Sequence, residues 1–385
     1  MGGTIMGNYD LVLSGGRVLD PASGLDEVCD VGFTDGKVAA IGDLGGDDAA
    51  ARKDVSGLLV TPGLIDLHTH VYWGGTSIGV DPDMVARRSA CTTVVDAGTA
   101  GPANMAGFRA HVIEPATVRV LPFLNVNFAG IFAFSGQVMV GENNDLRLID
   151  TRECVRVARE HGDLVVGVKV RVGAVASGDS GVAPLDMAIE AAEELGLPVM
   201  AHLDNPPPSR REVVDRLRPG DILTHCFRPF PNAPARGDGK IYEEIVAARD
   251  RGVIFDIGHG GGSFGFATTR AMLAAGFAPD AISSDIHSLS IDGPAFDLLV
   301  TMSKFLALGQ PLMDVVRAAT VAPAHAVRRP ELGRLAVGGV GDVSVIEDRP
   351  GWYRYSDVLG EELLGEHKLM PRAIVRDGKL WHEAA

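Results

Sequence analysis

The residues best suited to chemistry are histidines and an aspartate that end short apolar runs. His68 and His70 stand two positions apart in GLIDLHTH, while His202 ends PVMAH, His225 ends DILTH and Asp285 ends AISSD. Side chains on a strand alternate between its two faces, so both imidazoles of the HTH triplet would point the same way. Imidazole and carboxylate groups are the usual ligands of zinc and similar divalent ions. The pattern indicates a metal site, although an isolated pair of histidines is as often structural.

A lysine in another apolar run could complete that site. Lys169 lies in VVGVKVRV, where a buried amine is costly unless it is neutralised, paired or modified. Burial lowers the pKa of an amine, and a neutral amine can add carbon dioxide to form a carbamate. The two carbamate oxygens could bridge two metal ions. The alternative is an ion pair of Lys169 with Asp285 or Asp96, which would be preferred if the histidines were absent.

The segments around these residues predict how they are positioned. In residues 58–335, apolar β-type runs alternate with alanine-rich helical stretches, which is typical of successive βα units. Eight runs suit strands: GLIDLHTH, TTVVDAG, VRVLPFLNV, LVVGVKVRV, PVMAHLD, DILTHCF, VIFDIGH and AISSDIH. We therefore predict an α/β fold with a (β/α)₈ TIM barrel, whose chemistry lies at the carboxyl ends of its strands. The long segments 127–150 and 173–183 could cover the site or be passive loops.

The two chain ends have a different pattern. Residues 1–57 and 336–385 contain short runs of period two, with strong hairpin signals at Asp35-Gly36 and Asp377-Gly378. We expect both ends to form one small β-sandwich domain beside a catalytic barrel domain of residues 58–335.

The bulk composition is that of a soluble globular enzyme. Hydrophobic residues make up 46% and charged residues 22% of the chain. The net charge of -15, without any dense cluster of lysine and arginine, argues against a nucleic-acid partner. No signal peptide or membrane-spanning run is recognisable, so we expect a cytoplasmic protein that does not bind membranes. Four cysteines without CxxC spacing predict reduced thiols. The sequence does not decide whether the protein forms a homo-oligomer.

Three further residues are candidates for binding a small-molecule substrate. Arg171 has the same strand parity as Lys169 and should face the barrel interior, where its fork of donors suits a carboxylate. Arg228, in HCFRPF, could do similar work or lie on the surface. His259 ends VIFDIGH and could contact a substrate oxygen or cap the glycine-rich loop that follows.

These motifs together resemble the amidohydrolase superfamily, and within it the dihydroorotase-like amidohydrolase/deacetylase branch. The segment LLVTPGLIDLHTH looks like the family's entry into strand one, and the order HxH, Lys, His, His, Asp is similar throughout. The resemblance spans almost the whole chain. It implies two divalent metal ions, expected to be zinc, with these ligands: His68, His70 and Asp285 on one ion, His202 and His225 on the other, and carboxylated Lys169 bridging both.

The same resemblance implies a mechanism and a substrate class. A hydroxide bridging the two ions would attack a carbonyl polarised by one of them, and Asp285 would carry the proton to the leaving group. The expected reaction is hydrolysis of an acyl amide or ester, such as an acetyl group, on a small carboxylate-bearing amino or hydroxy acid. One alternative is cyclic amide opening, as in dihydroorotase or dihydropyrimidinase. Another is a catalytically silent barrel used for assembly, because a fold alone does not establish activity.

Overall fold

The computed structural model describes residues 9–384, whose central feature is a ring of parallel strands. Seven strands pair in chain order. They are β6 (Leu64–Thr69), β7 (Cys91–Ala97), β8 (Arg119–Asn125), β9 (Gly167–Val172), β10 (Val199–Leu203), β11 (Ile222–Leu223) and β12 (Ile254–Phe255). Segment 281–286 closes the ring through parallel bridges from Ala281 to Asp256 and from Ile286 to Thr69. The predicted barrel is confirmed, with an eighth strand that is reduced to isolated bridges.

Side-chain hydrogen bonds strengthen this weak closure. Asp66 of β6 accepts hydrogen bonds from the backbone nitrogen of Ser284, at 2.9 Å, and from the Ser284 hydroxyl. Both residues are fully buried. A buried carboxylate therefore replaces part of the missing backbone ladder between the first and last strands of the ring.

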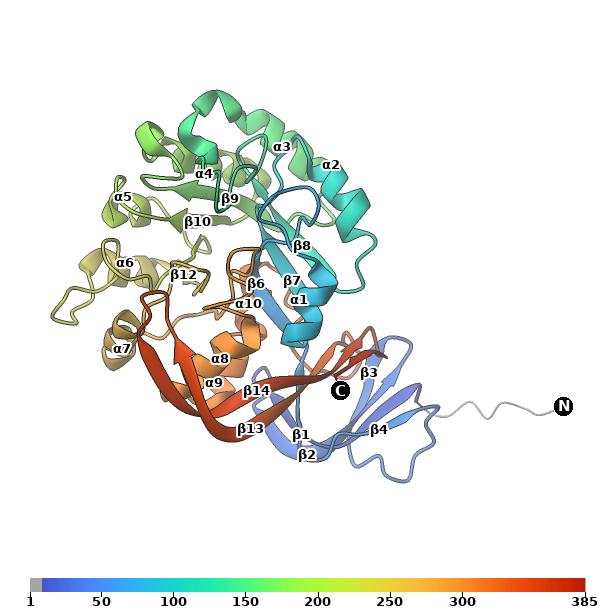
Figure 1. Cartoon of the computed structure of the whole chain (residues 1–385). Helices are drawn as coiled ribbons and strands as arrows, with labels where there is room; N and C mark the ends of the chain where they lie inside the picture. The colour runs from blue at the N-terminus through green and yellow to red at the C-terminus, as the bar shows by residue number, and fades with distance from the viewer. Residues whose placement is uncertain (1–8, 385) are drawn as a thin grey trace.

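Helices cover the outside of the ring and follow the strands in sequence (Figure 1). Asp81 and Asp150 cap the first and third of them through side-chain hydrogen bonds to backbone N–H groups. The helices are α1 (Pro82–Ser89), α2 (Met105–Phe108), α3 (Thr151–Glu160), α4 (Ala183–Leu195), α5 (Arg210–Val214), α6 (Glu243–Arg251), α7 (Phe266–Ala274), α8 (Leu298–Ala307), α9 (Leu312–Arg317) and α10 (Val321–Ala326). No helix within residues 9–384 is long and apolar enough to cross a membrane.

The two chain ends meet in a single sheet, drawn below the barrel in blue and red in Figure 1. Its strands are β1 (Leu11–Asp20), β2 (Leu25–Thr34), β3 (Lys37–Gly42), β4 (Arg52–Asp54), β5 (Leu59–Pro62), β13 (Val343–Ser356), β14 (Glu362–Arg376) and β15 (Lys379–Glu383). The antiparallel pair β5–β13 joins the ends. The shared sheet fits the expected terminal domain, whereas a sandwich of two layers stays a prediction.

The loops after β8 and β9 lie against each other at the mouth of the barrel. The backbone nitrogen of Asn143 donates to the carbonyl of Ala176 over 3.0 Å. Gly141 must be glycine here, because a Cβ would lie 2.0 Å from the carbonyl oxygen of Val175. The first loop contains the short 3₁₀ turns η2 (Glu142–Asn144) and η3 (Leu146–Leu148), and the second contains η4 (Gly178–Ser180). The two long segments therefore form one packed cover.

Candidate metal centre

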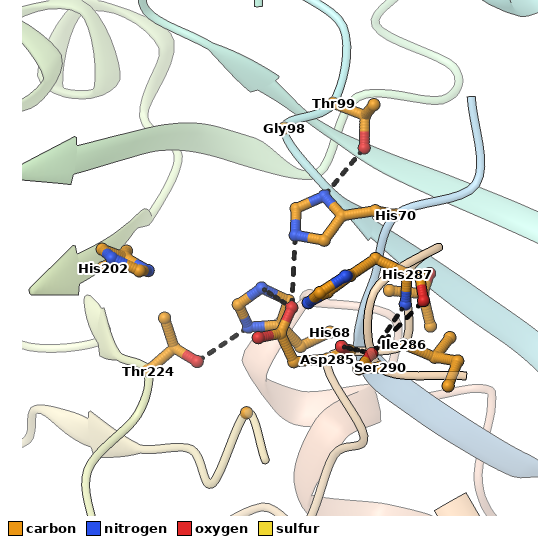
Figure 2. Close-up of polar contacts among 12 residues, drawn as sticks. His68, His70, Gly98, Thr99, His202, Thr224, Asp285, Ile286, His287 and Ser290 are labelled. Atoms are coloured by element: carbon orange, nitrogen blue, oxygen red, sulfur yellow. Dashed lines mark hydrogen bonds and ion pairs between the residues drawn. The ribbon is translucent and has the colours of Figure 1, made fainter. Parts of the chain in front are cut away.

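Two histidines and an aspartate meet at the carboxyl end of the barrel strands (Figure 2). His68 and His70 come from the end of β6, and Asp285 comes from the segment that closes the ring. The Nε2 atoms of both histidines lie 3.3 Å from Oδ1 of Asp285. All three side chains are buried, and their potential ligand atoms lie within 4.8 Å of one another. This donor set suits a divalent cation.

A threonine sets the proton position on His68. Thr224 donates its hydroxyl proton to Asp256 over 2.7 Å, so its oxygen accepts the proton on Nδ1 of His68, 2.8 Å away. Burial of Asp256 raises the pKa of its carboxyl to about 6. With its proton on Nδ1, His68 presents the lone pair of Nε2 toward Asp285.

His70 is held in the same way by a second threonine. The hydroxyl of Thr99 donates to Asp96 over 2.7 Å and lies 2.9 Å from Nδ1 of His70. Asp96 also accepts from the backbone nitrogens of Thr99 and Val71, so it both caps a turn and orients this threonine. Two parallel His–Thr–Asp chains therefore aim two Nε2 lone pairs at one point.

The other predicted histidines form a second, adjacent pair. Nδ1 of His225 lies 2.7 Å from the carbonyl oxygen of Gly258, to which it donates. The remaining nitrogen, Nε2, therefore carries a lone pair and lies 2.7 Å from Nδ1 of His202. His225 and Asp285 have φ values of 63° and 48°, in the left-handed region that residues other than glycine rarely adopt. Such strain at two strand ends is typical of functional positions.

Lys169 lies in the same cavity and its amine has no partner. The side chain is fully buried, and within residues 9–384 its Nζ atom makes no hydrogen bond. Burial lowers the pKa of this amine to about 7, against the opposing charge of Asp285. The ion pair considered as the alternative is not formed. An unpartnered buried amine beside four imidazoles fits a group that carries a modification or meets a metal ion.

Burial also sets the charge state of the groups around Lys169. It lowers the pKa of His70 to about 3 and that of His68 well below its usual value, so both imidazoles are neutral as metal ligands must be. Burial raises the pKa of Asp285 to about 6. A carboxyl with that value can both accept and release a proton near neutral pH.

The cavity between these groups is narrow and partly open to solvent. Its volume is about 30 Å³, far smaller than a typical ligand pocket. It is lined by His68, His70, Ile78, Ile131, Phe134, Lys169, Arg171, His202, Asp285 and His287. Ile131 and Phe134 belong to the long segment 127–150, which therefore covers the site. We expect this segment to shift when an acyl substrate binds, because the cavity beneath it is small.

Arg171 faces the cavity as predicted, but its charge is already neutralised. Its Nη1 atom lies 3.0 Å from Oε2 of Glu142, and both side chains are buried. The guanidinium carbon lies 4.9 Å from the ring centre of Phe134. Arg171 therefore holds the cover in place through an ion pair and a cation–π contact.

Arg228 is buried next to the histidine pair. It is 8% exposed, so the surface position left open by the sequence is excluded. Its charge acts, after burial, to lower the pKa values of His202 and His225. In the described part of the chain, its Nε and Nη1 atoms have no hydrogen-bond partner.

His259 does not line the cavity, and its contact with Gly260 fits the second of its two predicted roles, a cap of the glycine-rich loop. Its ring stacks on Phe264, with ring centres 4.6 Å apart. Nε2 lies 2.7 Å from Nζ of Lys304, and Nδ1 lies 2.9 Å from the carbonyl oxygen of Gly260. Both ring nitrogens are thus engaged, and none is available for a substrate.

Lys304 ties three distant segments together beneath the site. Besides His259, its ammonium donates to the carbonyl oxygens of Pro294 and Ser356, each at 2.8 Å. The loop it holds supplies the carbonyl that binds His225, and at Gly260 a Cβ would lie 2.2 Å from Oδ2 of Asp285. Lys304 therefore positions metal-site residues without touching them.

Replacing Lys304 with methionine is expected to lower the free energy of unfolding by about 3 kcal/mol, because three buried acceptors lose their donor. We also expect kcat to fall about tenfold, as for other groups that orient ligands. Urea denaturation and steady-state kinetics measure the two effects. Lys240→Met is the matched control, since that side chain is 79% exposed. Equal stability of both variants would contradict the structural role.

Several groups that complete the site were not among the residues predicted from the sequence. Thr99, Thr224, Asp256, Glu142 and Lys304 all contact a predicted residue. The sequence could have indicated Asp256, because it lies near the carboxyl end of the predicted strand VIFDIGH, as the metal-site residues do in their strands. No sequence pattern indicated Glu142 or Lys304, since Glu142 lies in a loop and Lys304 lies in an outer helix.

A (β/α)₈ barrel with imidazoles, a carboxylate and an unpartnered lysine at its mouth defines a class of metal-dependent hydrolases. No family model matches the chain. A deacetylase of Agrobacterium fabrum is 38% identical over 314 residues, which span 81% of this chain and 76% of that protein. The crystal structure of a dihydroorotase has a TM-score of 0.88 and 33% identity, covering 97% of this chain and 99% of that one. An adenine deaminase structure has a TM-score of 0.90 and 28% identity, covering 97% and 100%.

The chain belongs to the amidohydrolase superfamily, in its dihydroorotase-like branch. It is a metal-dependent amidohydrolase, and the resemblance inferred from the sequence is confirmed.

Proposed function

We propose that this enzyme is a binuclear zinc deacetylase that removes an acetyl group from a small carboxylate-bearing amino or hydroxy acid. The observation that carries the proposal is the joint placement of His68, His70 and Asp285 beside the pair His202–His225. The 38% identity to a deacetylase supports the reaction.

The side chains at the candidate metal centre are suitable ligands for the two proposed ions. His68, His70 and Asp285 would hold one ion and His202 with His225 the other, with a carbamate on Lys169 between them. In the described part of the chain, Nζ of Lys169 and Nε2 of His202 have no hydrogen-bond partner, which supports this assignment because buried polar atoms normally have partners. When bound, the ions would polarise the acyl carbonyl and make a water molecule a nucleophile at neutral pH.

The protein's own groups then position the reactants and move the proton. Thr99 and Thr224 fix the orientation of the first two imidazoles. Asp285 takes up a proton on its carboxylate as water attacks, and releases it to the departing amine or alkoxide. Ile131 and Phe134 line the cavity with apolar surface, and their closer approach over a bound substrate would exclude bulk water and strengthen electrostatic interactions inside the site.

Ring opening of a cyclic amide is the second candidate, favoured by the 33% identity to a dihydroorotase structure. Turnover of acetylated amino and hydroxy acids, measured against dihydroorotate and adenine with zinc and bicarbonate supplied, distinguishes the candidates. We expect kcat/KM for the best acetylated acid to exceed that for dihydroorotate by at least about a hundredfold. Dominant turnover of dihydroorotate would support the second candidate. Background rates for every substrate with metal bound would refute the substrate class and favour a catalytically silent barrel.

Several wider features belong to the same proposal. The proposed domains are a barrel of residues 58–335 and a terminal β-sandwich of residues 1–57 plus 336–385, of which residues 1–8 and 385 lie outside the described part of the chain. The proposed binding partner is a small-molecule substrate, and we expect binding to neither nucleic acids nor membranes. We place the protein in the cytoplasm and leave a homo-oligomer open. Of the three residues predicted to bind substrate, Arg171 is paired with Glu142 and both ring nitrogens of His259 are engaged. Within residues 9–384, Arg228 is the one of the three with unpartnered nitrogens.

A further inference from the structure

A buried cation without a counterion lies beside the metal-site histidines. Arg228 follows β11 and is 8% exposed, and its backbone nitrogen donates to the carbonyl of His225 over 3.1 Å. Among residues 9–384, no carboxylate comes within 4.0 Å of its guanidinium, and both Nε and Nη1 lack hydrogen-bond partners. A buried charge is costly unless an opposite charge meets it. An anion that bound to this guanidinium would lower that cost.

Asp204, the carboxylate whose charge acts on this arginine, does not pair with it. Asp204 acts on Arg228 only through a longer-range charge interaction, and it contributes less than burial does to the pKa of the guanidinium, which is lowered. Its Oδ2 atom accepts instead from the backbone nitrogen of Ala176 over 3.0 Å. Its Oδ1 atom has no partner in the described chain. A multiply charged anion such as phosphate would meet repulsion from Asp204, whereas a single carboxylate balances the single cation.

Arg171, which the sequence favoured as the residue that binds the substrate carboxylate, already has a counterion. Glu142 pairs with it at 3.0 Å, and Phe134 lies over its guanidinium. Binding a substrate carboxylate there would place two carboxylates on one guanidinium. The two arginines therefore have different tasks, although both are buried near His202.

We propose that Arg228 binds the carboxylate of the acyl substrate and makes the enzyme selective for acids over their neutral amides. A carboxylate can pair with a guanidinium along the Nε–Nη2 edge or along the Nη1–Nη2 edge. Each edge of Arg228 contains one of the two unpartnered nitrogens, which suits a bidentate pair. Arg228 does not itself line the cavity of about 30 Å³, but its backbone contacts His225 and its charge acts on His202 and His225. The proposed contact therefore lies on the side of the second histidine pair. The inference rests on the proposed deacetylase function.

The test compares acids with matched amides in metal-loaded enzyme. N-acetylalanine and N-acetylalaninamide, O-acetyl-lactate and O-acetyl-lactamide serve as pairs, each in both enantiomers. In wild type we expect kcat/KM for the acid to exceed that for the amide by about a hundredfold. Arg228→Met should lower the acid value about a hundredfold and change the amide value less than about threefold. Arg228→Lys should restore part of the preference, because it keeps the charge but loses the fork.

The competing arginine supplies the matched control. In the double variant Arg171→Met with Glu142→Gln, no unpaired carboxylate is left behind, and we expect the acid-to-amide ratio to stay within about threefold of wild type. The proposal would be overturned if this double variant lost the preference for the acid over the amide while Arg228→Met kept it. That outcome would leave the deacetylase function intact.

Binding measurements separate this proposal from the function on which it rests. Calorimetry with lactate and lactamide needs no turnover, so it applies even if none of the acetyl compounds is hydrolysed. We expect lactate to bind metal-loaded wild type at least about thirtyfold more tightly than Arg228→Met, with lactamide affected less. Equal lactate affinity in both proteins, or no lactate binding to wild type, would overturn the assignment of Arg228.

Discussion

Asp285→Asn is expected to lower kcat for the best acetylated acid by at least about a hundredfold, with an unchanged fold. Asparagine keeps an oxygen close to the Nε2 atoms of His68 and His70, which lie 3.3 Å from Oδ1 in the wild type. It cannot accept and release the proton that the leaving group requires. Steady-state kinetics, circular dichroism and metal analysis of the same preparations measure the three properties.

The control for this variant is Asp292→Asn, an exposed residue in the loop beyond the site, for which we expect wild-type rates. Metal content separates two possible roles of Asp285. A large loss of rate with the metal retained supports proton transfer, whereas a loss of rate in proportion to lost metal indicates a ligand alone. Near-normal rates with normal metal would contradict both roles.

Lys169→Met should abolish the proposed bridge and have the largest effect of any single change. We expect the metal content to fall from about two ions per chain to one or fewer, and kcat to fall by at least about a thousandfold. Methionine fills a similar volume, and removing the unpartnered Nζ atom removes a buried polar group, so stability should not decrease. Metal analysis and urea denaturation test these expectations.

The carbamate itself has a readout that is independent of activity. Wild type incubated with ¹³C-bicarbonate and zinc should give a carbamate carbon signal in an NMR spectrum, and Lys169→Met should give none. Lys240→Met, at an exposed position, is the matched control and should retain the signal. Two tightly bound ions in Lys169→Met, or absence of the carbamate signal from active wild type, would contradict the bridge.

The covering segment has a physical consequence for both experiments. The cavity of about 30 Å³ is small for the proposed substrates, so we expect Ile131 and Phe134 to shift when one of them binds. Arg171 links the cover to β9 through Glu142 at 3.0 Å, so opening must break or carry along a buried ion pair. Opening of such covers limits turnover in many enzymes. Rates of variants should therefore be compared under single-turnover conditions as well.

The amino-acid sequence alone determined the barrel and the set of metal-site candidates. Period-two alternation placed His68 and His70 on one side of a strand, and the positions of His202, His225 and Asp285 at the ends of apolar runs predicted that they meet. These inferences succeed because strand periodicity is local and because parallel strands in a barrel bring their carboxyl ends to one rim.

Only the tertiary structure decided which side chains satisfy one another. Thr224 meets His68 across 156 positions, Lys304 captures His259 across 45, and Glu142 neutralises Arg171 across 29. None of these separations matches a helix or strand period, so no local pattern could reveal them. Closure of the ring and packing of the loops bring these groups together, and a buried group must find its partner wherever the chain supplies one. That requirement left Arg228, rather than Arg171, with a charge still to be met.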